Sequence, residues 1–87
     1  MKKLLVKDIK DNDYTLIDDF NNSYFVNMKF YIEYKLEIGD IIYLPKSILI
    51  ETNSYAFGKI EPENKNTEDI IKVVTNKKEI YLQRYYG

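Results

Sequence analysis

The chain has 87 residues, no cysteine and no histidine, and its 13 basic and 14 acidic side chains leave a formal net charge of −1. This length suits one domain, residues 1–87, that folds without disulfides. The missing residue types exclude thiol chemistry, imidazole metal ligands and the Ser-His and Cys-His nucleophile pairs. The net charge disfavours a protein that binds nucleic acid mainly by attraction to its phosphate groups.

The first elements along the chain are two strands and two tight turns. Residues 4–10 and 14–17 are rich in aliphatic and β-branched side chains, and the Asp-Asn-Asp sequence at 11–13 predicts a turn between them. Residues 18–22 have the same turn chemistry. The carboxylates of both turns fit this chemistry better than a calcium loop, which needs a glycine at its sharp bend. Two tight connections predict an antiparallel meander.

The third strand pattern starts at Ser23 and alternates with a period of two. One parity is apolar and is expected to face the core: Tyr24, Val26, Met28 and Phe30. The other parity mixes polar and aromatic side chains: Phe25, Asn27, Lys29 and Tyr31. The pattern therefore predicts exposed aromatic rings at Phe25 and Tyr31.

The middle of the chain holds two shorter strand patterns. A Gly-Asp turn at 39–40 leads into a strand at 41–44, which the following proline ends because it has no backbone donor. Residues 46–51 predict a single helical turn that depends on burial of its aliphatic side chains. Residues 55–60 indicate another strand, in which Gly58 favours a bulge or a close approach.

The last segment contains one ambiguous element and one clear strand. Residues 67–74 fit either a capped helix or a strand, and the β-branched side chains at 70–75 favour the strand. A turn at 76–78 and a strand at 79–86 follow. The expected inward side chains are Ile80 and Leu82, and the expected outward ones are Tyr81, Gln83 and Tyr85.

These elements predict an all-β protein, a small antiparallel barrel with one short helical turn. The sequences at 6–9, 14–19, 24–27 and 36–44, with their strand, Asp-turn and Gly-Asp elements, resemble the first strands of OB-fold domains. The resemblance implies an OB-like barrel that binds oligonucleotides or oligosaccharides on its second and third strands. The residues that it places near such a site are Tyr14, Phe25, Asn27, Lys29 and Tyr31. An SH3-like barrel fits the same pattern.

Nine tyrosines and four phenylalanines are the main surplus in the composition. Outward aromatic rings suit stacking of bases or sugars, but tyrosine is also common on half-exposed sheets. Lysines gather near both ends of the chain and would form one positive face if the end strands pair. The candidate binding residues are Tyr14, Phe25, Asn27, Lys29, Tyr31, Tyr81, Arg84 and Tyr85.

We expect a non-enzymatic binding module that contacts a protein partner or a second copy of itself, with single-stranded nucleic acid or oligosaccharide as the alternative ligand. No catalytic residue, metal site or cofactor is expected. The first apolar run ends at Lys7, too early for a signal peptide, and no apolar stretch is long enough for a membrane-spanning helix. The absence of cysteine favours a reducing, cytoplasmic environment. Abundant Lys, Asn, Ile and Tyr indicate an AT-rich gene, typical of low-GC bacteria and their phages.

Overall fold

A closed sheet surrounds the core in the computed structural model, which describes residues 1–50, 54–60, 70–76 and 78–85. Its strands in these ranges are β1 (Lys2–Lys10), β2 (Asp13–Ile17), β3 (Ser23–Tyr31), β4 (Ile41–Leu44), β5 (Tyr55–Lys59), β6 (Ile70–Val74) and β7 (Glu79–Arg84). The helix α1 (Lys46–Ile50) follows β4. The predicted all-β class, the helical turn and the strand at 70–74 are confirmed, whereas the predictions for 51, 61–69, 77 and 86 lie outside the described residues.

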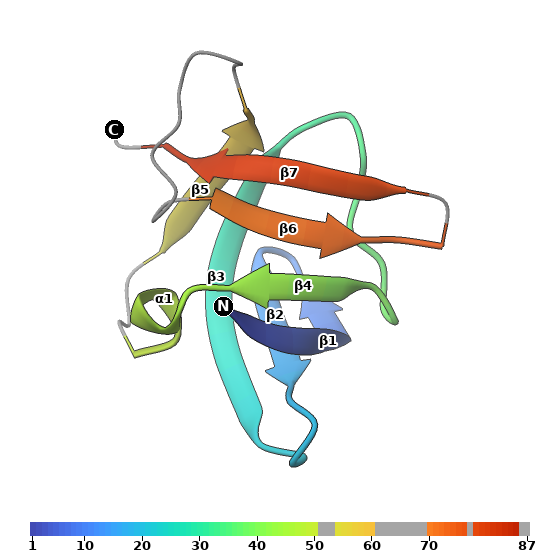
Figure 1. The fold of residues 1–87 in the computed structure, drawn as a ribbon, viewed down its shortest axis with the longest axis vertical. Coiled ribbons are helices and arrows are strands. Elements are labelled where there is room, and N and C mark those ends of the chain that lie inside the picture. Colours follow the sequence, from blue (N-terminus) through green and yellow to red (C-terminus); the bar gives the residue numbers. More distant parts are fainter. Residues whose placement is uncertain (51–53, 61–69, 77, 86–87) are drawn as a thin grey trace.

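The strands pair in the ring order β1-β2-β3-β5-β7-β6-β4, and β4 closes the ring on β1 (Figure 1). Strands β1, β2 and β3 form the predicted antiparallel meander. The pairing of β3 with β5 is parallel, so the prediction of an antiparallel barrel is wrong at this ladder. Parallel strands need a long crossover, and the chain from β3 to β5 supplies one that contains β4 and α1. An OB-fold barrel has five strands, whereas seven pair in the described part of this chain.

The basic ends of the chain do not form one continuous face. Strands β4 and β6 lie between β1 and β7 in the ring, so the two end strands are not neighbours. Figure 1 shows these four strands side by side across the front of the barrel. The lysines of β1 are therefore separated from Arg84, the basic residue of β7, by two other strands.

The inward side chains of all the strands meet in one core. On β3, Val26 and Met28 are buried while Tyr24 and Phe30 pack against the core, which confirms the predicted parity. Phe57 of β5 is completely buried and stacks on Phe30 with ring centroids 5.8 Å apart. The short α1 is held by its one buried side chain, Ile48, in agreement with the expectation that this turn depends on burial.

The turns use the residue types that the sequence indicated. Asp11 and Asn21 have φ angles of 55° and 65°, the left-handed region that short polar side chains tolerate. Gly39 has a φ of 98°, and its N–H donates to the carbonyl of Val6 at 2.9 Å. The Gly-Asp turn therefore attaches the β3–β4 connection to β1.

The carboxylate of Asp18 organises the turn between β2 and β3. It accepts hydrogen bonds from the backbone N–H groups of Phe20 and Asn22, each at 2.9 Å, and from the hydroxyl of Tyr24 at 3.1 Å. The ammonium of Lys2 lies 3.3 Å away. Burial alone would raise the pKa of this carboxyl, but the hydrogen bonds from Asn22, Lys2 and Phe20 outweigh it and hold the pKa well below its ordinary value of 3.8.

We expect the stability of the protein to fall in acid partly through Asp18. Because its pKa is lower in the folded than in the unfolded chain, its contribution is complete above about pH 5 and is lost as the pH falls below its ordinary pKa. The variant Asp18→Asn is expected to melt at a lower temperature at pH 7 and to lose part of the wild-type acid dependence. Thermal unfolding measured by circular dichroism between pH 7 and pH 2 checks this, with Asp19→Asn as the matched control. Equal acid profiles for Asp18→Asn and the wild type would contradict the assignment.

Candidate functional site

An unbroken row of aliphatic side chains crosses four strands on the outside of the barrel. Leu5 of β1 lies opposite both Ile17 of β2 and Ile41 of β4, and Ile41 lies opposite Val74 of β6. Their chain neighbours Leu4, Leu16, Ile42 and Val73 are buried, so these four point outward. Directly opposite residues hold their Cβ atoms about 5 Å apart, which makes the row continuous. We call it the apolar row.

Phe25 extends the apolar row onto β3. Ile17 pairs with Ser23, so Phe25 is its diagonal neighbour, at a spacing that an aromatic ring can bridge. The side chain of Phe25 is 80% exposed and that of Leu5 is 40% exposed. Ile17, Ile41 and Val74 are half-buried, so the row is a continuous and partly exposed apolar strip, and extended apolar surface of this kind often marks a binding site.

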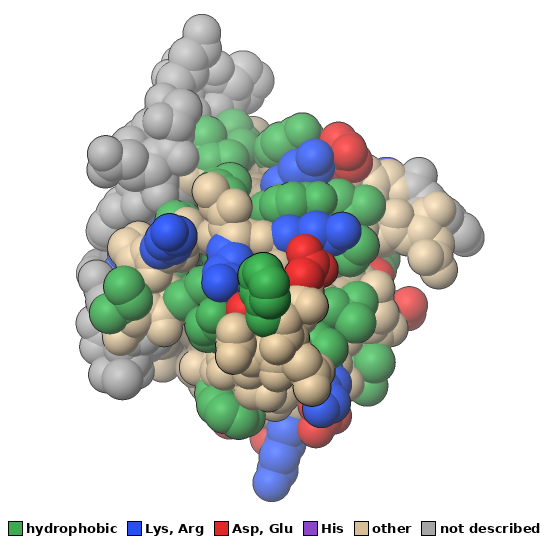
Figure 2. Space-filling model, turned by 60° about the horizontal axis from the view of Figure 1, so that its bottom comes forward, with side chains coloured by type: hydrophobic (Ala, Val, Ile, Leu, Met, Phe, Trp, Pro, Cys, Tyr) green, Lys and Arg blue, Asp and Glu red, His purple; other side chains and the backbone are tan. Residues whose placement is uncertain are grey.

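A second row, of tyrosines and lysines, runs beside the apolar row. Lys3 of β1, Tyr43 of β4, Lys72 of β6 and Tyr81 of β7 are successive cross-strand partners. The ammonium of Lys72 lies 5.0 Å from the ring centroid of Tyr43 and 3.4 Å from Oε1 of Glu79. Figure 2 shows basic and hydrophobic side chains interleaved over this side of the molecule. We call this set the tyrosine–lysine row.

A separate aromatic cluster lies over β3, β5 and β7. The rings of Tyr31 and Tyr85 are 5.7 Å apart and tilted by 52°, and each side chain is about half exposed. The ammonium of Lys29 lies 5.4 Å from the Tyr31 ring centroid. Gly58 lies opposite Tyr31 on β5, and a Cβ at this glycine would collide with the Tyr85 ring. The close approach predicted at Gly58 is therefore confirmed, and we call this set the tyrosine pair.

Six of the eight candidate binding residues lie on the outer surface, but in different places. Lys29, Tyr31 and Tyr85 meet in the tyrosine pair, Phe25 joins the apolar row and Tyr81 joins the tyrosine–lysine row. The amide of Asn27 donates to Oδ1 of Asp13 at 2.7 Å, so this side chain is occupied by a cross-strand bond.

The structure places the other two candidates on the inner side of the barrel. Tyr14 is only 7% exposed and meets Phe30 edge to face, with ring centroids 5.6 Å apart, so its assignment to a binding surface is wrong. Burial raises the pKa of its hydroxyl. Arg84 lies opposite the buried Phe57, and its guanidinium lies 4.6 Å from the ring centroid of Tyr55. Arg84 therefore caps one end of the core and is not part of the tyrosine pair.

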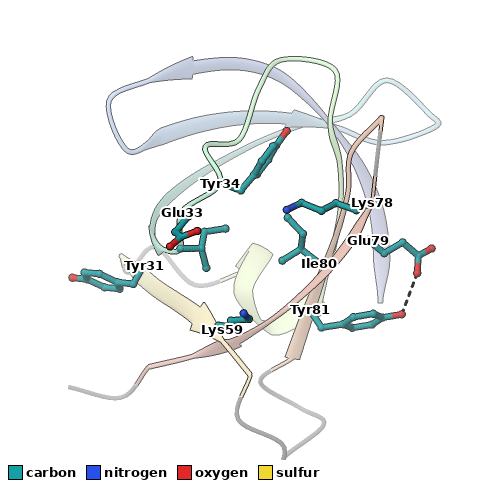
Figure 3. Close-up of a pocket in the computed structure, with 9 residues that line it drawn as sticks. Tyr31, Glu33, Tyr34, Lys59, Lys78, Glu79, Ile80 and Tyr81 are labelled. Atoms are coloured by element: carbon teal, nitrogen blue, oxygen red, sulfur yellow. Dashed lines mark hydrogen bonds between the residues drawn. The ribbon is translucent and has the colours of Figure 1, made fainter.

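An open pocket of about 490 Å³ lies between the chain that leaves β3 and the first half of β7 (Figure 3). Residues 31–34, Lys59 and residues 78–81 line it. The Tyr34 hydroxyl donates to Oδ2 of Asp40 at 2.9 Å, and burial together with this carboxylate raises the pKa of Tyr34 to about 12. Tyr34 is therefore a fixed wall of the pocket and stays protonated. Among the described residues, no three carboxylates gather in a way that could hold a metal ion.

The residues of the apolar row were missed by reasoning from the sequence, although a signal for them is present. Each belongs to a pair of adjacent apolar residues in a strand whose other side is buried. In a strand of period two, one member of such a pair must face outward. The pairs are Leu4 and Leu5, Leu16 and Ile17, Ile41 and Ile42, and Val73 and Val74.

The chain matches no family model, and no curated protein or solved structure is significantly similar to it. No helix within the described ranges is long and apolar enough to cross a lipid bilayer.

Proposed function

We propose that this protein is a non-enzymatic module that binds another protein through the outer face of β1, β4 and β6. The observation that carries the proposal is the apolar row, in which four aliphatic side chains face outward on four adjacent strands. On the solvent side of an antiparallel sheet, alternation normally places polar residues at such positions. Apolar side chains there are stabilised when a partner surface covers them.

The chemistry beside the apolar row indicates what kind of partner fits. Interface cores are enriched in tyrosine, and their rims are polar. Tyr43 lies beside the apolar row and between Lys3 and Lys72, as a tyrosine of an interface core with a polar rim would. Lys3 forms no ion pair with a carboxylate of the described residues. The partner surface is therefore expected to be apolar at its centre and acidic where it meets Lys3.

A photo-crosslinking experiment tests the proposal. A benzoylphenylalanine is incorporated at Tyr43, between the two rows, or at Phe20, an exposed aromatic in the turn after β2. The Tyr43 probe is expected to give one dominant protein adduct in cells, which is lost when Ile41→Lys is added, and the Phe20 probe is expected not to give it. If the only adduct is a second copy of this chain, and light scattering shows a matching dimer, the partner is another copy of the protein and not a different protein. Adducts that do not depend on Ile41 would refute the proposal.

A second candidate function, binding of single-stranded nucleic acid, is favoured by the tyrosine pair. Two half-exposed rings beside the Lys29 ammonium combine a stacking surface with a phosphate contact. The resemblance of residues 6–44 to OB-fold domains supports the same candidate, since β3 corresponds to a strand that those domains use. The formal net charge of −1 makes it the second choice.

The variant Gly58→Ala tests this second candidate without removing an aromatic ring. A methyl group at this position displaces the ring of Tyr85 from Gly58 and so separates it from Tyr31. If the tyrosine pair stacks on bases, an oligothymidine of about ten nucleotides should bind the variant roughly tenfold more weakly at low salt. Fluorescence anisotropy measures this, and Ala56→Gly, on the same strand, is the control. Equal binding by the variant and the wild type, or no binding by the wild type, would remove this candidate.

A further inference from the structure

The tyrosine pair brings two phenol rings into contact across an intervening strand. Strand β5 lies between β3 and β7 in the ring, so the backbone of Tyr31, at the end of β3, and that of Tyr85, directly after β7, lie about 10 Å apart. Their ring centroids are nevertheless 5.7 Å apart. The two side chains therefore lean toward each other over the outer face of β5.

Small residues on β5 make this contact possible. Phe57 is buried and points inward, so the outward positions on either side of it are Ala56 and Gly58. The N–H of Tyr85 donates to the carbonyl of Ala56 at 2.7 Å, which fixes the Tyr85 backbone beside β5. Gly58 leaves the space that the Tyr85 ring fills, since a Cβ there would collide with the ring. A larger residue at this position would push the ring away from Tyr31.

The tyrosine pair also differs from the other ring contacts among the described residues, because it joins two tyrosines. The others each include a phenylalanine and lie in or against the core: Tyr14 with Phe30, Phe30 with Phe57, and Tyr55 with Phe57. The side chains of Tyr31 and Tyr85 are 53% and 50% exposed, so a dissolved reagent reaches both rings. The pair therefore holds two phenols that are both adjacent and accessible.

Adjacent phenols share one characteristic reaction, which is oxidative coupling. Each phenol loses one electron and its hydroxyl proton, and the two phenoxyl radicals join through a bond between the ring carbons next to the oxygens. The hydrogen on each of these carbons then moves to restore the hydroxyl group. A peroxide consumed by a haem peroxidase takes up the two electrons and two protons and leaves as two water molecules. The ammonium of Lys29, 5.4 Å from the Tyr31 ring centroid, does not oppose this step, because each radical is neutral.

We propose that the tyrosine pair is an oxidation site, at which peroxide and a haem peroxidase join Tyr31 to Tyr85 as an intramolecular dityrosine cross-link. Two radicals held side by side couple faster than radicals on separate molecules, because their effective concentration is far higher. The bond ties the residue after β7 to the end of β3 and closes a loop of more than half the chain. Such a closure restricts the unfolded chain and so stabilises the fold. The reaction needs neither a protein partner nor a nucleic acid, so it goes beyond the proposed function.

Oxidation of the full chain at low micromolar concentration with a haem peroxidase and hydrogen peroxide tests this site. We expect dityrosine fluorescence in a product that stays monomeric on a denaturing gel, is lighter by two hydrogen atoms and contains peptides linked through Tyr31 and Tyr85. The variants Tyr31→Phe and Tyr85→Phe keep their rings and are expected to lose this product at least about tenfold. The matched control Tyr81→Phe, on a ring that is also half exposed, is expected to change the yield less than about twofold.

Gly58 and the stability of the product give two further tests. Gly58→Ala is expected to lower the yield at least about threefold, because the added methyl group moves the Tyr85 ring. The cross-linked chain is expected to melt about 10 °C or more above the untreated chain. No dityrosine, covalent dimers as the only product, or equal yields for the wild type and Tyr31→Phe or Gly58→Ala would overturn the inference. An unchanged melting temperature would overturn the stabilising role of the bond.

Discussion

Replacing Phe57 with alanine is expected to remove about 3 to 5 kcal/mol of folding free energy, the usual cost of deleting a fully buried aromatic ring. Phe57 is completely buried and stacks on Phe30 at 5.8 Å and beside Tyr55 at 6.3 Å. A domain of this size has a total stability of roughly 4 to 13 kcal/mol, so the variant should lose a large share of it. Urea unfolding followed by circular dichroism measures the difference.

The control for Phe57→Ala is Phe25→Ala, which removes the same side chain from the surface. Phe25 is 80% exposed, so its replacement is expected to change stability by less than about 0.5 kcal/mol. A loss below about 1 kcal/mol for Phe57→Ala would contradict the placement of β5 between β3 and β7, since that placement is what buries the ring.

Ile41→Lys is expected to weaken binding of the protein partner at least about thirtyfold, because Ile41 is placed as a hot spot at the centre of the interface and a hot spot contributes about 2 kcal/mol or more. Ile41 lies in the middle of the apolar row, between Leu5 and Val74. A lysine there leaves an ammonium group facing apolar side chains of the partner, and its desolvation adds to the lost contact. Calorimetric titration with the partner identified by crosslinking at Tyr43 measures the change.

The matched control is Ile50→Lys, which makes the same substitution at an exposed isoleucine of α1. This variant is expected to bind within about twofold of the wild type, because α1 contributes no residue to the apolar row. Similar losses for both variants would indicate a general effect of added charge and would count against the apolar row as the contact surface.

The strands of this fold could be predicted because their signals are local. Period-two alternation located β3 and its inward side chains, and Asp11, Asn21 and Gly39 are at turns that need a left-handed backbone. The parallel pairing of β3 with β5 has no local signal, since it depends on how the whole crossover packs. The same limit applies to the separation of β1 from β7, which is a property of the complete ring.

The candidate site could be predicted only where strand parity decides it. Strand parity correctly predicted that Phe25 and Tyr31 of β3 are exposed, but it could not show which strands lie beside them. Tyr14 was assigned through the OB-fold resemblance, although it shares its parity with the buried Leu16 and so belongs to the core. The apolar row follows only once Leu5 is known to lie between β2 and β4.

The central claim is that the outer face of β1, β4 and β6 binds a protein, and isoleucine methyl spectra test it most directly. The protein, labelled at its isoleucine methyl groups, is titrated with the free partner that the crosslinking experiment identified. The methyl signals of Ile17 and Ile41 are expected to shift on binding, while those of Ile50 on α1 and the buried Ile71 stay in place. Shifts at Ile50, or at Ile32 and Ile80 of the pocket in Figure 3, with Ile17 and Ile41 unchanged, would contradict the claim.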